Sequence, residues 1–224
     1  MKTPPSRHRR IGSHKRPERA RRESVASDHI LQLFDTDESL ARSVAAFLDA
    51  GADEDQALLV LATMPHWNAI STELRNLGTD LAASRAGARL TVLDAEEMLA
   101  RVMRRGEPNR ALFAQNVAAM VTRLANDAPN GLRIYAEMVE LLAQEGNYAS
   151  AARLEHLWNE VGAQCRFTLL CGYSAAHFAA PDAGSALAVI CCEHSQSLST
   201  RADPLGQFLL ASGQARNPPF TAIG

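Results

Sequence analysis

The sequence has few cysteines and no long apolar segment. The four cysteines of this 224-residue chain include no CxxC pair, which argues against a disulfide-stapled secreted domain and indicates a reducing, cytoplasmic environment. No stretch of 18 apolar residues occurs, so we expect no membrane span. The hydrophobic content of 46% is ordinary for a globular protein, and this length suggests one domain with appendages.

The sequence also lacks the motifs of common nucleotide-binding and hydrolytic sites. The loop after the first expected strand reads DTDES (35–39), without the glycines and lysine of a phosphate-binding loop, and no GxGxxG follows a strand. No serine lies in a GxSxG elbow. We therefore expect a non-enzymatic protein with no catalytic residues. The alternative is a degenerate nucleotide hydrolase that uses Asp94 or Glu137 with magnesium.

Cysteine and histidine do not occur in the spacings typical of zinc sites. Cys191, Cys192 and His194 lie close together in CCEH, but adjacent cysteines on a helix point in different directions, and the paired CxxC and HxxxH spacings are missing. Cys171 lies late in an apolar segment, which favours a buried apolar role. His29 is interpreted as a satisfied polar group. The sequence thus predicts neither a metal nor a cofactor.

Charge is distributed unevenly along the chain. Residues 1–27 contain nine basic and two acidic residues, a net charge of +7, whereas residues 28–195 carry a net charge of −10 and residues 196–224 carry +1. The first segment is rich in Pro, Ser and Arg, so we expect a disordered basic tail, either a solubilising extension or a weak contact to nucleic acid or an anionic surface. Residues 196–224 are expected to be a loosely ordered tail.

Hydrophobic patterning between residues 28 and 195 predicts an α/β domain. Short apolar runs alternate with segments of helical periodicity, which is typical of a mostly parallel sheet of five or more strands flanked by helices. The expected strands cover 29–34, 57–63, 89–94, 131–138 and 166–173. The expected helices cover 38–51, 65–83, 95–106, 109–127, 137–146, 149–161 and 181–195.

Polar side chains stand at the expected strand ends. Ligands of parallel α/β sheets bind beyond the carboxyl ends of the strands, so the sequence predicts a ligand-binding cleft there. The candidate residues are Asp35, His66, Asp94, Glu137 and Tyr173. The three acids would converge if their strands were neighbours. For Asp35 and Asp94, a role as helix N-terminal caps is the favoured interpretation, whereas Glu137 is the least easily explained as a cap.

The segment YAEMVELLAQEGNYASAARLEHLWNEV (135–161) predicts two helices after a strand. Leu154, Leu157 and Trp158 form an apolar stripe that anchors the second helix to the sheet. Glu155 points away from the centre of this stripe, and we expect it to be solvent-facing or to form a partly buried pair with an arginine such as Arg153.

This segment, together with HILQLFDTDE, RLTVLDAEEML, FTLLCGY and CCEHS, resembles the MEDS domain, a sensory domain of methanogens and methylotrophs named after a dichloromethane-responsive repressor. The resemblance covers residues 29–195. Phe34 departs from it, because a tyrosine is usual there. Matching family-typical positions are His29, Asp35, Asp94, Tyr135, Glu137, Glu155, Trp158, Asn159, Cys171 and Tyr173.

The resemblance implies a RecA/KaiC-like core without a Walker A motif, which agrees with the DTDES loop. It also implies a bacterial or archaeal regulatory module that binds a small organic ligand or a signalling partner such as a histidine kinase. We accordingly expect a sensory role in signal transduction or transcription control.

Overall fold

The computed structural model describes residues 27–87, 89–179 and 183–199 of the chain. The basic tail expected over residues 1–27 lies outside this part except for Ser27. Residues 200–224 of the expected C-terminal tail also lie outside it. Among the described helices, none combines the length and apolar character that a membrane crossing requires.

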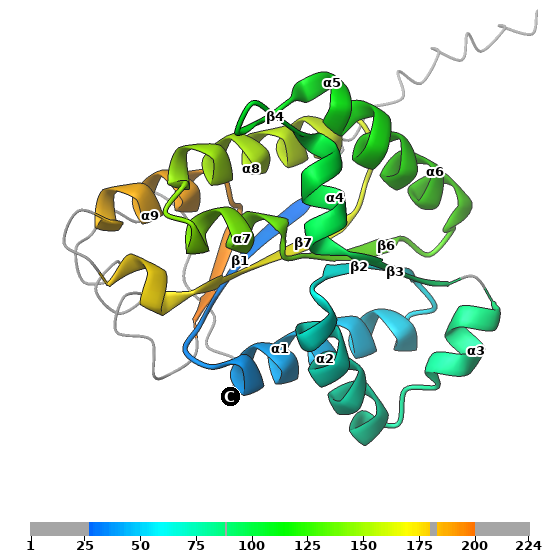
Figure 1. The fold of residues 1–224 in the computed structure, drawn as a ribbon. Coiled ribbons are helices and arrows are strands. Elements are labelled where there is room, and N and C mark those ends of the chain that lie inside the picture. Colours follow the sequence, from blue (N-terminus) through cyan, green and yellow to red (C-terminus); the bar gives the residue numbers. More distant parts are fainter. Residues whose placement is uncertain (1–26, 88, 180–182, 200–224) are drawn as a thin grey trace, which may run out of the picture.

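The described residues form an α/β domain around a six-stranded sheet, which confirms the predicted fold class (Figure 1). Its strands run parallel in the order β3-β2-β6-β7-β1-β8. They are β1 (Asp28–Phe34), β2 (Ala57–Ala62), β3 (Leu90–Asp94), β6 (Leu132–Ala136), β7 (Thr168–Ser174) and β8 (Gln196–Ser199). A two-stranded antiparallel ribbon consists of β4 (Met103–Arg104) and β5 (Glu107–Pro108).

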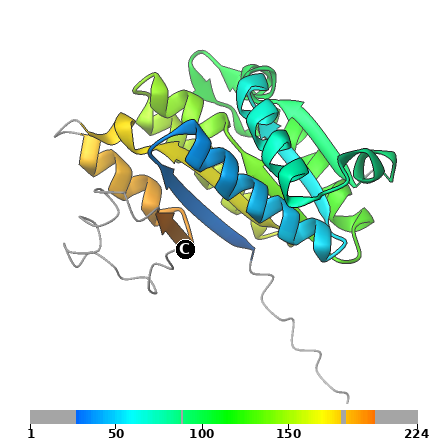
Figure 2. The same cartoon turned by 90° about the horizontal axis from the view of Figure 1, so that it is seen from below.

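Helices cover both faces of the sheet. On one face lie α1 (Asp37–Asp53) and α2 (Met64–Leu77), with α3 (Leu81–Ala86) beside β3. The opposite face carries α4 (Ala95–Val102), α5 (Arg110–Phe113), the π-helical turn η1 (Ala114–Ala118), α6 (Ala119–Asp127), α7 (Met138–Gln144), α8 (Tyr148–Gly162) and α9 (Ala183–Cys192). A 3₁₀ turn, η2 (Ala175–Phe178), follows β7. Figure 2 shows α1 and α2 side by side across the sheet.

The connections leave β2 and β6 in opposite directions. From β2 the chain passes through α2 on one face toward β3, and from β6 it passes through α7 and α8 on the other face toward β7. Such a switch point opens a crevice beyond the carboxyl ends of two neighbouring strands, which is where ligands bind in open α/β sheets. The residues that follow β2 and β6 therefore have the best position for a ligand site.

Local sequence explains where the main helices begin and end. Thr36 and Ser39 form a reciprocal capping box at the start of α1, which satisfies two backbone N–H groups that helix geometry leaves open. Pro65 lies in the first turn of α2, and Gly78 ends this helix with a φ of 96°, a left-handed conformation that glycine adopts without strain. Asn147 caps α8.

Two apolar layers hold the sheet between the helices. β2 reads ALLVLA and is buried on both faces, with Leu59 and Leu61 on one side and Leu58 and Val60 on the other. The α4–α9 side includes Trp158, which packs edge-on against Phe113 with ring centroids 5.3 Å apart. The anchoring role predicted for Trp158 agrees with this packing.

Three elements differ from the sequence-based expectation. The expected helix 65–83 is interrupted at Gly78 and continues as the separate α3. The helix expected over 95–106 ends at Val102, because residues 103–108 turn back as the β4–β5 ribbon around Arg105 and Gly106, both at positive φ. Residues 196–199, placed in the loose tail, pair with β1 as β8.

Candidate functional site

Glu137 is a buried carboxylate at the switch point between β2 and β6. Its own N–H continues the sheet by donating to the Leu61 carbonyl over 2.9 Å, and its residue is only 2% exposed. The carboxylate accepts hydrogen bonds from the Thr63 N–H (2.8 Å) and the Thr63 hydroxyl (3.0 Å). These contacts explain how a charge is tolerated there, because buried carboxylates require hydrogen-bond donors.

His66, on the first turn of α2, connects this carboxylate to the protein surface. Its Nδ1 lies 2.6 Å from Glu137 Oε1, and its Nε2 lies 3.4 Å from Asp37 Oδ1 at the start of α1. The hydrogen bond to Glu137 raises the pKa of His66, while partial burial opposes the rise. The imidazolium form is therefore favoured, with one N–H donated inward and the other outward. We call Thr63, His66, Glu137 and Asp37 the strand-end cluster.

A second acid lies next to this cluster. Glu140 on α7 is 5% exposed; its Oε2 accepts the Ser174 N–H over 3.1 Å, and its Oε1 lies 2.9 Å from His177 Nε2. Burial raises the pKa of Glu140 to about 8, and the nearby charge of Glu137 adds to the rise. Burial lowers the pKa of His177. Both shifts favour a neutral pair at pH 7, in which protonated Glu140 donates to His177.

The three predicted acids do not follow neighbouring strands. The strands that precede Asp35, Asp94 and Glu137 are not neighbours, because β2 separates β3 from β6 and β7 separates β6 from β1. Four strand spacings of about 4.8 Å place the ends of β1 and β3 roughly 19 Å apart. Asp94 caps α4 by accepting the Glu97 N–H over 3.0 Å, and Asp35 is exposed beside the cap residue Thr36.

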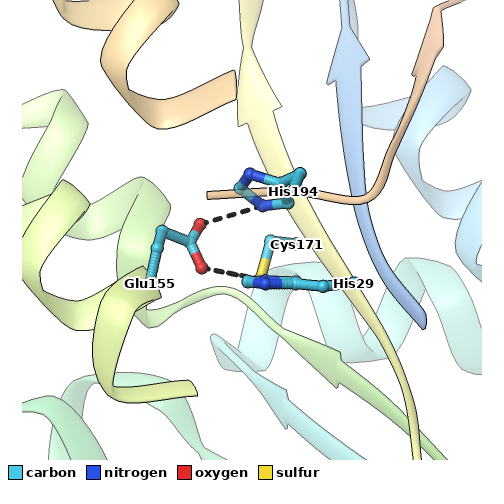
Figure 3. Close-up of side chains that lie close together, drawn as sticks. All are labelled: His29, Glu155, Cys171 and His194. Carbon is cyan, nitrogen blue, oxygen red and sulfur yellow. Dashed lines mark hydrogen bonds and ion pairs between the residues drawn. The ribbon is translucent and has the colours of Figure 1, made fainter. Parts of the chain in front are cut away.

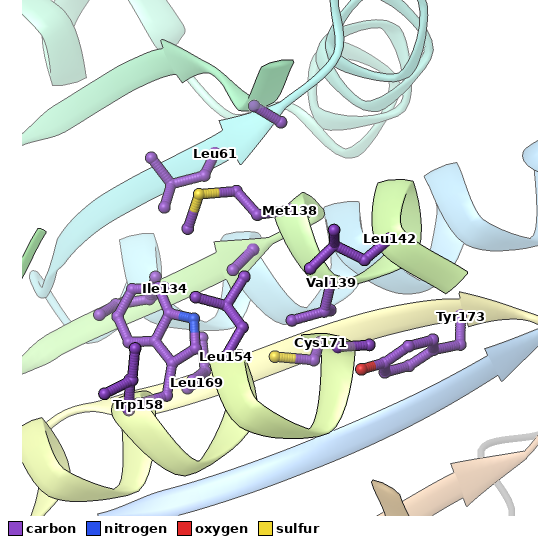
Figure 4. Packing of buried hydrophobic residues seen from close by; sticks show 14 of the residues in the cluster. Leu61, Ile134, Met138, Val139, Leu142, Leu154, Trp158, Leu169, Cys171 and Tyr173 are labelled. Atoms are coloured by element: carbon purple, nitrogen blue, oxygen red, sulfur yellow. The ribbon is translucent and has the colours of Figure 1, made fainter. Parts of the chain in front are cut away.

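Tyr173 takes part in a different group of buried side chains, on the α8 side of the sheet. Its hydroxyl donates to Glu155 Oε1 over 2.7 Å, and Glu155 also contacts His29, Cys171 and His194 (Figure 3). We call His29, Glu155, Cys171 and His194 the buried cluster. Figure 4 shows Cys171 and Tyr173 beside the apolar side chains of α7 and α8.

The expectation for Glu155 was wrong. This residue is 0% exposed, and its partners are histidine, tyrosine and cysteine, whereas Arg153 pairs with Glu107. The buried face of α8 is wider than its leucines and Trp158 suggest, because residues of β1, β7 and the segment after α9 contact Glu155. His194 belongs to the buried cluster without its neighbours Cys191 and Cys192.

A buried hydroxyl without a partner lies behind the strand-end cluster. Among the described residues, the Tyr135 hydroxyl on β6 has no hydrogen-bond partner, and the residue is 0% exposed. A methyl group added at Gly172 would come within 3.4 Å of this oxygen and 3.0 Å of the Leu40 side chain. Glycine at position 172 therefore makes room for the tyrosine on this face of β7.

The strand-end cluster offers the chemistry of a small polar binding site. Its outward-facing N–H group, on His66, has Asp37 as its partner among the described residues, and the Asp37 side chain is 73% exposed. An exposed ion pair contributes little free energy, so a hydrogen-bond acceptor can compete with Asp37 for His66. His66 and Glu137 were predicted candidates, whereas Asp37, Glu140 and His177 were not.

Comparison with protein families gives one match. The family model for MEDS, described as the MEthanogen/methylotroph, DcmR Sensory domain, matches residues 28–194. This range contains the whole strand-end cluster and the whole buried cluster. No curated protein matches the chain.

Proposed function

Because the chain belongs to the MEDS family of sensory domains, we propose that it is a regulatory module whose strand-end cluster binds a small organic ligand and reports the binding to a signalling partner. The observation that carries the proposal is the position of His66. It joins a buried carboxylate at the switch point to an exposed acid on another helix. A ligand with a carboxylate, carbonyl or hydroxyl oxygen would accept the outward N–H of His66 in place of Asp37.

The same exchange supplies a route from ligand to partner. Asp37 is the first residue of α1, and α1 packs along α2, which carries His66. A ligand that replaces Asp37 removes a link between the N-terminal ends of these two helices. It then favours conformations in which α1 is less tightly held, and a partner that binds the α1–α2 face distinguishes the two populations. A histidine kinase or another signalling protein is the proposed class of partner.

Binding of short carboxylates tests this proposal directly. Formate, acetate and propionate are titrated into the full chain at pH 6 by calorimetry, and small molecules that co-purify with the protein are identified by mass spectrometry. We expect saturable binding that weakens at least about 10-fold in His66→Asn and in Glu137→Gln, since each loses a charge-assisted hydrogen bond. The matched control is His156→Asn, an exposed histidine on α8, which should bind as the wild type does.

Two results would overturn the assignment. One is equal binding by the wild type and both cluster variants, which would place the ligand elsewhere. The other is the absence of any bound organic molecule, added or co-purified, in a folded protein.

The nucleotide-hydrolase alternative is tested in the same samples with Mg-ATP. We expect no phosphate release, because Asp35, Thr36 and Asp37 occupy the loop where phosphates would require N–H groups and cations.

A further inference from the structure

The buried cluster brings together four side chains from four separate segments. His29 comes from β1, Cys171 from β7, Glu155 from α8 and His194 from the turn after α9 (Figure 3). Glu155 and Cys171 are 0% exposed, and His29 and His194 are 4% exposed. Each residue offers one atom that can bind a metal, and these four atoms lie within 4.8 Å of one another. Ionisable groups gathered this deeply require a specific compensation.

Three of the distances between these atoms, those among His29 Nε2, Glu155 Oε2 and Cys171 Sγ, match the edges of a tetrahedral metal site, and His194 Nε2 completes a set of four atoms within 4.8 Å of one another. His29 Nε2 lies 3.1 Å from Glu155 Oε2, His194 Nε2 lies 3.3 Å from Glu155 Oε1, and Cys171 Sγ lies 3.4 Å from both His29 Nε2 and Glu155 Oε2. With Zn–N and Zn–O bonds of about 2.0 Å and a Zn–S bond of about 2.3 Å, a tetrahedron places N and O about 3.3 Å apart and N and S about 3.5 Å apart.

Hydrogen bonds at the far side of both imidazole rings turn their Nε2 atoms toward the centre of the cluster. Asn159 donates through its Nδ2 to two oxygen atoms of Glu193, both at 2.8 Å, so its Oδ1 faces His29 Nδ1 at 2.8 Å and accepts the proton there. His194 Nδ1 donates to the Ile190 carbonyl over 2.8 Å. Metal-binding histidines are held in this way, with the second nitrogen donating to a carbonyl or carboxylate.

Within the buried cluster, His194 Nε2 has no hydrogen-bond partner among the described residues. It is completely buried, yet it makes no hydrogen bond with any described residue, although a carboxylate oxygen lies 3.3 Å away. The Tyr173 hydroxyl already donates to this same oxygen. His194 Nε2 and the Glu155 carboxylate thus lie close together without suitable hydrogen-bond geometry. This arrangement is expected if both bind the same metal ion.

Charge balance also favours a dication at this position. The two rings have centroids only 4.1 Å apart, so two imidazolium ions would repel each other with one carboxylate between them. If one ring is neutral, its Nε2 lone pair faces Glu155 instead. A metal dication bound to two neutral imidazoles, the Glu155 carboxylate and the Cys171 thiolate gives a neutral site, and this avoids the free-energy cost of unbalanced buried charge.

We propose that His29, Glu155, Cys171 and His194 form a tetrahedral binding site for zinc. Two imidazoles, a thiolate and a carboxylate suit zinc, whereas magnesium and calcium prefer oxygen ligands alone. The thiol proton of Cys171 is released to solvent as the Zn–S bond forms. With all four positions taken by protein atoms, the site joins β1, β7, α8 and the end of α9, which is a structural role.

The experiment measures metal in the untagged full chain. Wild-type protein loaded with zinc and then desalted should contain one zinc per chain, as measured by inductively coupled plasma mass spectrometry. Cys171→Ser and His194→Asn should each lose most of it. The matched controls are Cys165→Ser, whose thiol hydrogen-bonds with Thr122 and the Val161 carbonyl, and His156→Asn on the exposed side of α8. Both controls should keep the full stoichiometry.

Cobalt substitution keeps the proposal testable if a ligand variant fails to fold. Co²⁺ added to metal-free wild-type protein should give the visible bands of tetrahedral cobalt and a near-ultraviolet thiolate-to-cobalt band, and both should persist in Cys165→Ser. Tyr173→Phe, which removes only the hydrogen bond to Glu155, should weaken zinc affinity about 10-fold.

A folded wild-type protein without bound zinc or these cobalt bands would overturn the zinc site. Equal zinc binding by Cys171→Ser and the wild type would overturn it as well. The strand-end cluster shares none of the four ligands, so failure here leaves the proposed ligand site standing.

Discussion

At the scale of single residues, the contact between Glu137 and His66 shifts the protonation equilibrium of the imidazole. Glu137 raises the pKa of His66 above 6.5. This charge interaction stabilises the fold below pH 6.5, and the contribution is lost as the pH rises through the raised pKa. Glu137→Gln should therefore reduce the free energy of unfolding by about 1–3 kcal/mol at pH 6 and by less at pH 8.5.

Urea unfolding at the two pH values, together with an NMR titration of the His66 ring, measures this effect. The pKa of His66 should move down toward its ordinary value in Glu137→Gln. A variant with the same loss of stability at both pH values would show that the carboxylate acts only through its bonds to Thr63.

The buried acid Glu140 should make the protein less stable as the pH rises. A salt-bridged acid has the opposite effect. Burial raises its pKa from 4.5 to about 8, so the folded protein holds a proton that the unfolded chain has released. Stability should fall as the pH rises from about 4.5 to about 8, by at most about 3–5 kcal/mol. Glu140→Gln keeps the neutral form, and its unfolding free energy should change much less across this range. Parallel profiles of wild type and variant would contradict the shift.

At this scale, the sequence allows a prediction where a residue's position along the chain is informative. Glu137 follows an apolar strand and is a poor cap, and both features can be read directly. Glu155 could not be placed, because its burial depends on β1, β7 and the end of α9 meeting on one flank of α8. His29 and His194 are 165 residues apart in sequence, so no local spacing predicts that both contact the Glu155 carboxylate.

At the scale of elements, the start of α1 carries both a capping motif and part of the strand-end cluster. The Thr36 hydroxyl accepts the Ser39 N–H over 3.2 Å. The next residue, Asp37, contacts His66 in the strand-end cluster. Thr36→Ala should reduce the free energy of unfolding by about 1 kcal/mol and speed hydrogen exchange in the first turn of α1, while Thr36→Ser should preserve both. Hydrogen-exchange mass spectrometry of the peptide containing residues 36–44 provides the measurement. Unchanged exchange in Thr36→Ala would show that tertiary contacts alone hold this turn.

The elements that the sequence predicted are those with strong periodicity. All five expected strands are present, since apolar runs such as ALLVLA bury both faces of a parallel sheet. β8 was missed because QSLS has little apolar content and is ordered through pairing with β1. The break at Gly78 was missed because the apolar spacing continues through it to Leu81, although the positive φ that glycine permits ends α2 there.

At the scale of the whole molecule, strand order decides which predicted residues meet. The expected convergence of three acids assumed that their strands were neighbours, an arrangement that local periodicity cannot test. The observed order brings Glu137 beside Thr63 and His66, and it puts the strands that precede Asp35 and Asp94 on opposite sides of β2 and β6. It also separates the two clusters onto different faces, with His66 on the α2 side and Glu155 on the α8 side. The proposed ligand site and the proposed zinc site can therefore be altered independently.

The charge division between the N-terminal segment and the domain predicts which part of the chain binds polyanions. Residues 1–26 carry a net charge of +7 and residues 28–195 carry −10, so any affinity for polyanions should come from the N-terminal segment. If about five of its basic residues contact phosphates, binding to duplex DNA should weaken about 10²–10³-fold between 50 and 200 mM salt. Vesicles containing anionic lipid provide the second probe.

Deleting residues 1–26 is a clean test, because it keeps Ser27, whose hydroxyl donates to the Gly162 and Cys165 carbonyls and fixes the start of β1. The shortened chain should bind neither DNA nor vesicles at 50 mM salt, since its acidic domain repels both, while its melting temperature and its response to short carboxylates stay unchanged. Binding that is insensitive to salt, or that survives the deletion, would locate the polyanion contact on the folded domain instead.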